Sequence, residues 1–143
     1  MAFPDRIVRS LDIAHPPAKV WAALTTAEGL GTWFGNKATI DLRPGGAASL
    51  TWDDEQEKDL RIERVEEPTV LGFTWGIDGL PDDDPRRTYV EFTLEPVEGG
   101  TRLTVVETGF GQLSDDEHDR SFGGNVDGWA RELGELADYL DAT

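Results

Sequence analysis

The sequence predicts an α+β fold in which an antiparallel sheet of about seven strands packs against a long C-terminal helix. Between residues 6 and 107 the apolar residues mostly alternate with polar ones, which is the period of half-buried strands. From residue 114 onward the apolar spacing changes to three and four, which is the period of an amphipathic helix. The expected order is one strand, two short helices, six strands and the long helix. The 143 residues are expected to form one domain.

The first strand and both short helices are expected before residue 36. Apolar residues alternate over Arg6–Ile13, and Arg9 shares their face. Pro16 and Pro17 end that strand and suit the first turn of a helix. Thr25–Glu28 resembles a capping box, which predicts a second short helix toward Trp33 and Phe34.

Six further strand-like segments follow, in hairpin succession. They are centred on residues 38–42, 48–52, 60–62, 71–75, 90–94 and 103–107. Turns are expected at Arg43–Gly46, Glu66–Pro68 and Gly99–Gly100, because these residues favour turn conformations. The acidic run Asp53–Lys58 predicts a solvated loop, and the loop Gly76–Arg87 is expected to control access to the interior. Successive hairpins make the sheet antiparallel.

The C-terminal segment carries its own start signal. Ser114–Glu117 is a capping box with acidic residues where the helix dipole favours them. Gly123 and Gly124 are expected to kink or interrupt the helix before its apolar stripe. That stripe comprises Val126, Trp129, Leu133, Leu136 and Leu140.

The composition excludes several classes of function. A formal net charge of -16 makes nucleic acid and anionic membrane poor partners, because both are themselves negatively charged. The chain has no apolar run of about 18 residues and no basic, apolar start typical of a secretory signal, so a cytoplasmic location is expected. With no cysteine, thiol catalysis and disulfides are excluded. The acid-rich, lysine-poor composition leads to the hypothesis of a high-salt or high-GC host.

Several motifs in register give the chain a family resemblance. Ala14–Thr25 resembles the "APxxxVWxALT" opening of proteins related to the activator of heat-shock protein 90 ATPase. The later matches are Trp33-Phe34, Arg43–Gly46, Glu66–Pro68, Leu71–Trp75, Gly100–Thr104, Gly109-Phe110 and Gly128-Trp129. Together they cover essentially the whole chain.

The resemblance implies a fold and a range of functions. The family belongs to the START-like (SRPBCC) superfamily, whose helix-grip fold, also that of Bet v allergens, wraps a curved antiparallel sheet around a C-terminal helix. A cavity between sheet and helix is implied. Relatives with this fold bind lipids, polyketides or flavonoids, cyclise polyketides, protect against antibiotics, or assist the chaperone, and fold-level analogy does not choose among these functions.

Inward-facing positions predict an apolar pocket with a polar anchor. Large flat aromatics suit a planar ring ligand, because they offer stacking faces and an N–H donor. The candidate ligand-binding residues are Trp52, Phe73, Trp75, Phe92, Leu94, Glu107, Phe110, Trp129, Leu133 and Arg9, with Trp52, Trp75, Phe92 and Trp129 as the walls. Most of these residues could equally form the core alone.

Glu107 is the one candidate for a catalytic role. It follows Val105 at strand period, so its carboxylate is expected to face inward and could serve as acid, base or ligand acceptor. Relatives often carry histidine here, within an "HxGF"-like ending. The alternatives are a structural pair with Arg9, or a bulge that turns Glu107 to solvent. Arg9 could bind a ligand carboxylate or phenolate, or could simply extend to solvent.

No metal site and no cofactor are expected. His15 and His118 have no second histidine nearby, and Asp82–Asp84 lacks the spacing of a calcium loop. The leading hypothesis is non-catalytic binding of a small hydrophobic molecule, either aromatic or similar to a polyketide or lipid. The alternatives are a cyclase-like or hydrolase-like enzyme that uses Glu107, and a chaperone ATPase-activating cofactor or a stress or antibiotic-resistance protein.

Overall fold

The computed structural model describes residues 6–52, 57–77, 80 and 84–142, with the side chains of 119–125 excepted. One sheet contains seven antiparallel strands in the order β1-β7-β6-β5-β4-β3-β2. The strands are β1 (Arg6–Ile13), β2 (Lys37–Ile40), β3 (Ala47–Thr51), β4 (Glu57–Glu66), β5 (Val70–Gly76), β6 (Arg87–Val97) and β7 (Gly100–Thr108). This arrangement confirms the predicted α+β, helix-grip fold.

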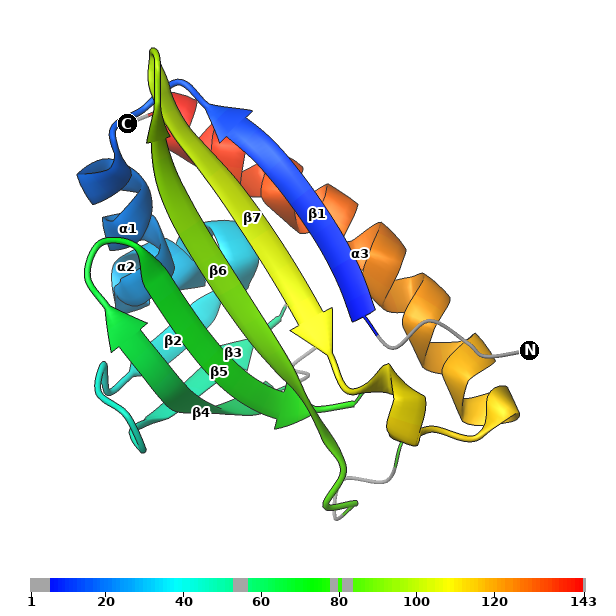
Figure 1. The fold of residues 1–143 in the computed structure, drawn as a ribbon. Coiled ribbons are helices and arrows are strands. Elements are labelled where there is room, and N and C mark those ends of the chain that lie inside the picture. The colour runs from blue at the N-terminus through cyan, green and yellow to red at the C-terminus, as the bar shows by residue number, and fades with distance from the viewer. Residues whose placement is uncertain (1–5, 53–56, 78–79, 81–83, 143) are drawn as a thin grey trace.

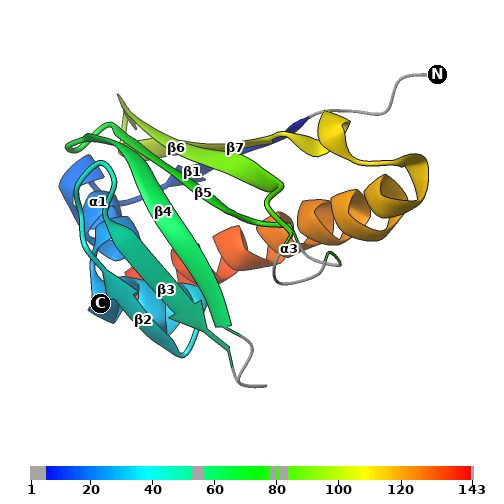
Figure 2. The ribbon, with the colours of Figure 1, turned by 90° about the horizontal axis from the view of Figure 1, so that it is seen from below.

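The sheet curves around α3 (Asp115–Asp141), which lies on its concave side (Figures 1 and 2). The expected interruption at Gly123-Gly124 is wrong, because the helix runs through both glycines without a break. Two helical glycines cost about 2 kcal/mol relative to alanine. Burying Trp129, Leu136 and Leu140 stabilises the helix by more than that. No helix among the described residues is long and apolar enough to cross a membrane.

Two short helices and a π-helical turn connect β1 to β2. They are α1 (Pro17–Thr25), α2 (Ala27–Gly29) and η1 (Leu30–Phe34), and η1 closes with a hydrogen bond from the Gly35 N–H to the Leu30 carbonyl. The N-cap of α2 is Thr26, whose Oγ1 accepts from the Gly29 N–H at 3.0 Å. The sequence prediction placed this N-cap one residue too early: the hydroxyls of Thr25 and Thr26 both donate to carbonyls of α1, and Thr26 is the one that accepts from the Gly29 N–H.

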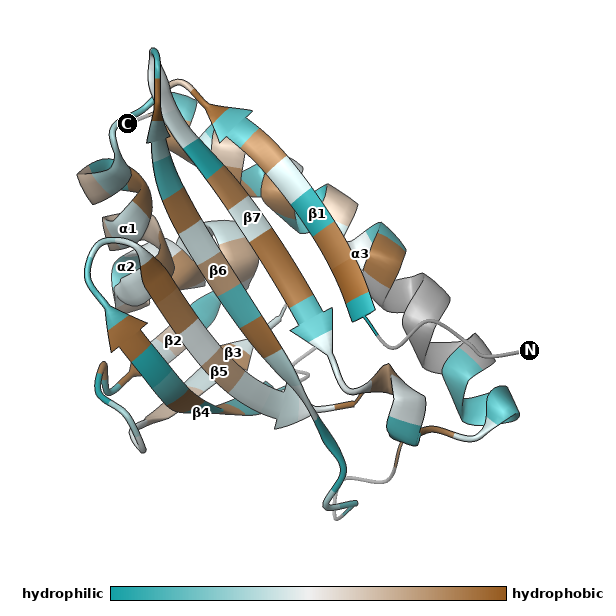
Figure 3. Cartoon of the chain, in the orientation of Figure 1, coloured by the Kyte–Doolittle hydropathy of each residue, from teal (hydrophilic) through white to brown (hydrophobic). Residues whose placement is uncertain are grey.

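The strands bury one face and expose the other. Apolar and polar bands alternate along β1, β6 and β7 in Figure 3. On β6 and β7 the inward positions Val90, Phe92, Leu103 and Val105 are almost fully buried. The core therefore lies between the concave face of the sheet, the α1–η1 segment and α3.

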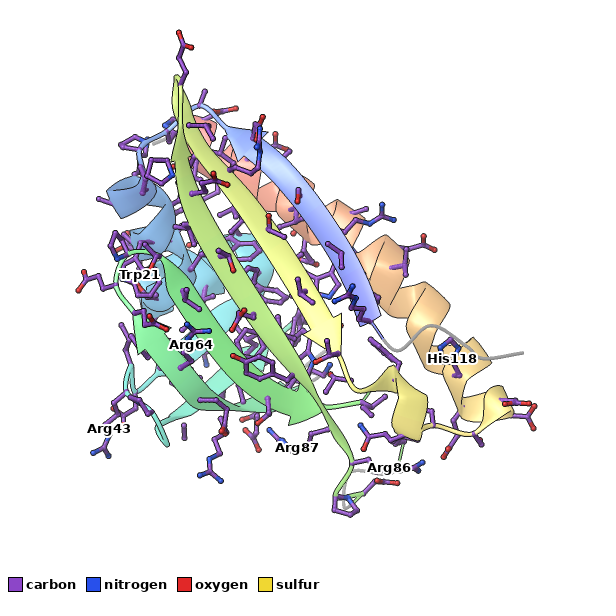
Figure 4. All side chains as sticks on the ribbon, viewed as in Figure 1. Trp21, Arg43, Arg64, Arg86, Arg87 and His118 are labelled. Carbon is purple, nitrogen blue, oxygen red and sulfur yellow. The ribbon has the colours of Figure 1, made fainter. Side chains whose placement is uncertain are left out.

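An arginine joins the start of α3 to the segment before β6. Arg86, labelled in Figure 4, lies just before β6. It donates two hydrogen bonds of 2.7 Å to the Glu117 carboxylate, and it also donates to Asp84. Glu117 completes the predicted capping box with Ser114. The Arg86 guanidinium is the main reason that the pKa of Glu117 falls to about 2. These contacts fix the first turn of α3 at the lower end of the sheet.

Candidate functional site

Glu107 lies at the centre of a buried polar cluster beneath α3. It alternates with Leu103 and Val105 on β7, so its side chain points to the concave face, where it is fully buried. Its Oε2 accepts hydrogen bonds from the Trp75 indole at 2.8 Å and from the Thr88 hydroxyl. Its Oε1 accepts from the Trp129 indole at 2.9 Å. Glu107 thus joins the sheet to the helix through hydrogen bonds.

Strand register brings these groups together. Trp75 on β5 pairs directly with Thr88 on β6, while Glu107 on β7 pairs with Val90, the next inward position of β6. Inward side chains of three adjacent strands therefore converge on one carboxylate. Trp129 reaches the same carboxylate from α3.

The two structural alternatives for Glu107 are both wrong. β7 pairs regularly with β6 through Glu107, so no bulge turns the side chain to solvent. The described hydrogen bonds of Glu107 come from Trp75, Thr88 and Trp129, whereas Arg9 is exposed on the edge strand β1. Although its register position belongs to the inward face, Arg9 is exposed on β1, the edge strand of the sheet, where a long charged side chain can extend to solvent.

An aromatic cluster surrounds the carboxylate. The rings of Trp75 and Trp129 stack at a centroid distance of 5.7 Å. Phe34 of η1 lies against Trp52, Trp75 and Trp129 at 5.7 to 5.9 Å. We call Phe34, Trp52, Trp75 and Trp129 the aromatic cluster. The sequence prediction included its three tryptophans but not Phe34, although the Trp33-Phe34 motif was the available signal.

A lysine lies on the outer side of this cluster. The Lys58 Nζ sits 3.7 Å from the centroid of the Trp75 ring, a cation–π contact. Lys58 belongs to β4, two residues before the buried Leu60, so strand alternation points it inward. The sequence prediction did not include Lys58, because it assigned the whole acidic run Asp53–Lys58 to a solvated loop. Lys58 and Trp52 are both only half-buried, so they form the solvent-facing rim of the cluster.

A small apolar cavity adjoins the cluster. Its volume is about 10 Å³, room for about one water molecule. It is lined by Leu24, Leu30, Phe34, Ile40, Ala48, Leu50, Leu60, Ile62, Leu71, Phe73 and Phe92. Ligand pockets are typically at least about 300 Å³. A ring-sized ligand therefore requires side chains to move at this cavity.

The remaining predicted site residues lie in the core. Phe73, Phe92, Leu94, Phe110 and Leu133 are all buried. Phe73 and Phe92 contact the aromatic cluster, at 5.3 Å from Trp75 and 5.7 Å from Trp129 respectively.

Phe110 follows Gly109, whose φ of 112° turns the chain out of β7. Its ring packs edge-on against the buried His118.

The predicted loop residues and histidines have structural contacts. Asp82 and Asp83 lie outside the described residues, while Asp84 accepts hydrogen bonds from Arg86. His15 bonds to Asp141 at 2.8 Å, which ties the start of α1 to the end of α3. Within the described ranges, no three histidine or acidic side chains are placed to hold a metal ion.

Glu132 on α3 is a second buried carboxyl group. Only 7% of the residue is exposed, and among the described residues its Oε2 has no hydrogen-bond partner. Burial, and then the neighbouring charge of Glu135, raises the pKa of Glu132 to about 7. Sequence analysis missed Glu132 because exposed acids are common on helices.

Comparison with known proteins identifies the family of this fold. Residues 14–141 match the family described as "Activator of Hsp90 ATPase homolog 1-like protein". The chain belongs to this family. The family membership and the helix-grip fold confirm the resemblance drawn from the sequence motifs. No curated protein matches the chain.

Solved structures of similar shape include protein MLL2253 from Mesorhizobium loti, with 30% sequence identity and a TM-score of 0.83 over 96% of this chain and 98% of that chain. DynU16, from the dynemicin biosynthetic locus, is 24% identical with a TM-score of 0.81, and the alignment covers 97% of this chain and 48% of DynU16. The Aha1 dimer from Colwellia psychrerythraea is 21% identical with a TM-score of 0.77, over 94% and 95% of the two chains. At these identities the last two likenesses show the fold alone.

Proposed function

We propose that this member of the family binds a small, hydrophobic, planar molecule, aromatic or polyketide-like, at the aromatic cluster and does not transform it. The observation that carries the proposal is the packing of Phe34 against three tryptophans, two of which donate to one buried carboxylate, with Trp52 and Lys58 half-buried at the rim. Flat rings with polarised N–H groups suit planar ligands. The dynemicin locus of DynU16 supplies the first class of compound to test.

Binding at this cluster requires rearrangement. Phe34 touches all three tryptophans and also lines the small cavity, so its ring separates the two regions. The ligand enters from the rim beside Trp52 and displaces the Phe34 ring, and the side chains that line the small cavity must move with it. The π-helical turn η1 supports this movement, since such turns are frequent at functional sites.

The hydrogen bonds of Glu107 favour binding over catalysis. Both of its oxygens accept from protein donors, and the side chain is fully buried. A general base must reach the proton that it abstracts within about 3 Å. In the alternative, enzymatic function, Glu107 would be that base, and the tryptophans would have to release it first. Full turnover by Glu107→Gln on any substrate found would exclude that role.

The test is ligand-dependent thermal stabilisation, because a ligand that binds only the folded state raises the melting temperature. We expect a saturable shift of several degrees with one class of planar aromatic, polyketide or flavonoid. Trp52→Ala should remove that shift, because Trp52 is half-buried at the rim and its loss leaves the core intact. Trp21→Phe, in the core but outside the aromatic cluster, should keep it. Equal shifts in both variants would refute the location.

Chaperone activation is the second candidate, and the family description is the observation that favours it. Its test is ATP hydrolysis by the chaperone of the same host, with and without this protein. Stimulation of the ATPase would support a chaperone cofactor, and an unchanged rate would reject it. A protein partner with a basic surface would fit the net charge of -16.

A further inference from the structure

In the free protein the positively charged ammonium group of Lys58 lies over one face of the Trp75 ring. The ammonium nitrogen lies 3.7 Å from the ring centroid, well within the range of cation–π attraction. The same ring donates its N–H to Glu107 at 2.8 Å. Hydrogen bonding of the N–H to a carboxylate increases the electron density of the indole, because donors and acceptors polarise one another. The face of Trp75 is therefore more attractive to a cation than that of an isolated indole.

The surrounding groups favour a cation as well. Trp129 stacks on Trp75 and donates its own N–H to the same carboxylate. Trp52 and Phe34 add further rings at the rim and interior. Aromatic cages of this kind recognise organic ammonium groups. The net charge of -16 raises the local concentration of cations and lowers that of anions.

We propose that the ligand of this site carries a positive charge, and that its ammonium group takes the place of Lys58 over Trp75. This inference rests on the proposed function and names its ligand class, a planar molecule bearing a protonated or quaternary amine. Lys58 is half-buried at the rim, so a ligand can reach its position from solvent. Lys58 thereby competes with the ligand and keeps the ring face covered in the free protein.

The test compares three probes that share one ring system and differ in charge: naphthylmethylammonium, naphthylmethanol and naphthoate. Their affinities are measured by calorimetric titration of the full chain. We expect the ammonium probe to bind about tenfold more tightly than the neutral one, the size of a partly desolvated cation–π contact. Naphthoate should bind more weakly than either.

Two variants that each remove one positive charge locate the effect. Lys58→Ala uncovers the Trp75 face and should strengthen binding of the ammonium probe by about fivefold. Arg43→Ala changes the net charge equally, but Arg43 lies exposed in the turn before β3, where it pairs with Asp41, so this variant should leave the affinity unchanged. An equal gain in both variants would mean that only net charge acts, which would overturn the proposal.

The remaining outcomes separate this inference from the proposed function. If naphthylmethanol binds as tightly as the ammonium probe, the proposed planar-ligand site is supported and the proposed positive charge of its ligand is refuted. If naphthoate binds best and Lys58→Ala abolishes its binding, Lys58 anchors an anion and the inference is overturned. If none of the three probes binds to either the native chain or Lys58→Ala, the proposed function fails together with the inference.

Discussion

Three donors depend on the Glu107 carboxylate, and this makes Glu107 the most sensitive residue of the interior. In Glu107→Leu the Trp129 indole N–H and the Thr88 hydroxyl lose their described buried acceptor, while the Trp75 indole N–H keeps the Thr88 oxygen at 3.0 Å. Each unsatisfied buried group costs about 1–3 kcal/mol, so we expect a loss of at least about 2 kcal/mol in the free energy of unfolding. Glu107→Gln retains one acceptor oxygen and should lose less. Urea denaturation measures both changes.

The control for Glu107 is Glu95→Leu, an exposed glutamate on β6. Its stability should stay within about 0.5 kcal/mol of the native chain. A Glu107→Leu variant as stable as this control would show that the hydrogen bonds to the tryptophans contribute nothing.

Glu132 should make stability depend on pH near neutrality. Its pKa is raised to about 7 in the folded state from an ordinary 4.5, mainly by burial. Between these values the folded chain holds a proton that the unfolded chain releases, so stability falls as pH rises from about 5 to about 8. We expect Glu132→Gln to flatten this fall and to be the more stable protein at pH 8.

The melting temperature between pH 5 and pH 8 measures the effect of Glu132. Asp138→Asn on the exposed face of α3 removes one charge without removing a buried carboxyl group, and it serves as the control. If Glu132→Gln and Asp138→Asn follow the same pH profile, Glu132 is not the group that titrates.

The residues of the site differ in how far the sequence could reveal them. Alternation placed Trp75, Glu107 and Trp129 on inward faces, and the structure joins all three by hydrogen bonds. Lys58 shares the inward register of Leu60, but the acidic run before it hid the start of β4, and Phe34 lies outside any strand. Their roles depend on how β4 and η1 pack against Trp75, and no local pattern in the sequence encodes that packing.

At the level of secondary-structure elements, Arg86 holds the first turn of α3 against the segment before β6. Arg86→Met removes the two hydrogen bonds to Glu117, so the pKa of Glu117 should rise from about 2 toward its ordinary value. A depressed carboxyl pKa stabilises the fold above about pH 4.5, and this contribution is lost as pH falls toward 2. We therefore expect faster hydrogen exchange at residues 115–118 in Arg86→Met at neutral pH.

Arg43→Met is the matched control for Arg86. Arg43 pairs only with Asp41 among its described partners, on the exposed turn before β3. Its loss should leave exchange in α3 unchanged. Unchanged exchange in Arg86→Met as well would mean that the Ser114 cap alone holds the helix start.

The sequence predicted which strands and helices exist more accurately than it predicted where each one begins and ends. Apolar periodicity predicted all seven strands and the long helix, because burial of one face determines both periods. Periodicity alone gave the wrong prediction where the local preference of a residue opposes its tertiary packing. The glycines at 123 and 124 weaken a helix, yet the stripe that follows holds α3 against the sheet. Thr25 and Thr26 both donate a hydroxyl to the preceding helix, and the described bond from the Gly29 N–H goes to Thr26, so residue spacing alone did not identify the N-cap.

The charge of the whole molecule predicts a dependence on salt. With a formal net charge of -16, like charges repel across the folded surface. Salt at about 1 M shortens the screening length to about 3 Å, so the melting temperature should rise by several degrees from low salt. A melting temperature that does not change with sodium chloride would remove the halophilic hypothesis.

The central claim, that a planar ligand binds at the aromatic cluster of this family member, has five built-in reporters. The chain contains five tryptophans, and each indole N–H gives a separate signal in a proton–nitrogen correlation spectrum. Titration with a planar aromatic that stabilises the protein should shift the signals of Trp52, Trp75 and Trp129. The signal of Trp21, which lies outside the aromatic cluster and η1, should stay in place, whereas Trp33 stacks on Phe34 at 4.7 Å and should move with it. Stabilisation without movement of the Trp75 and Trp129 signals, or with movement only at Trp21, would contradict the account.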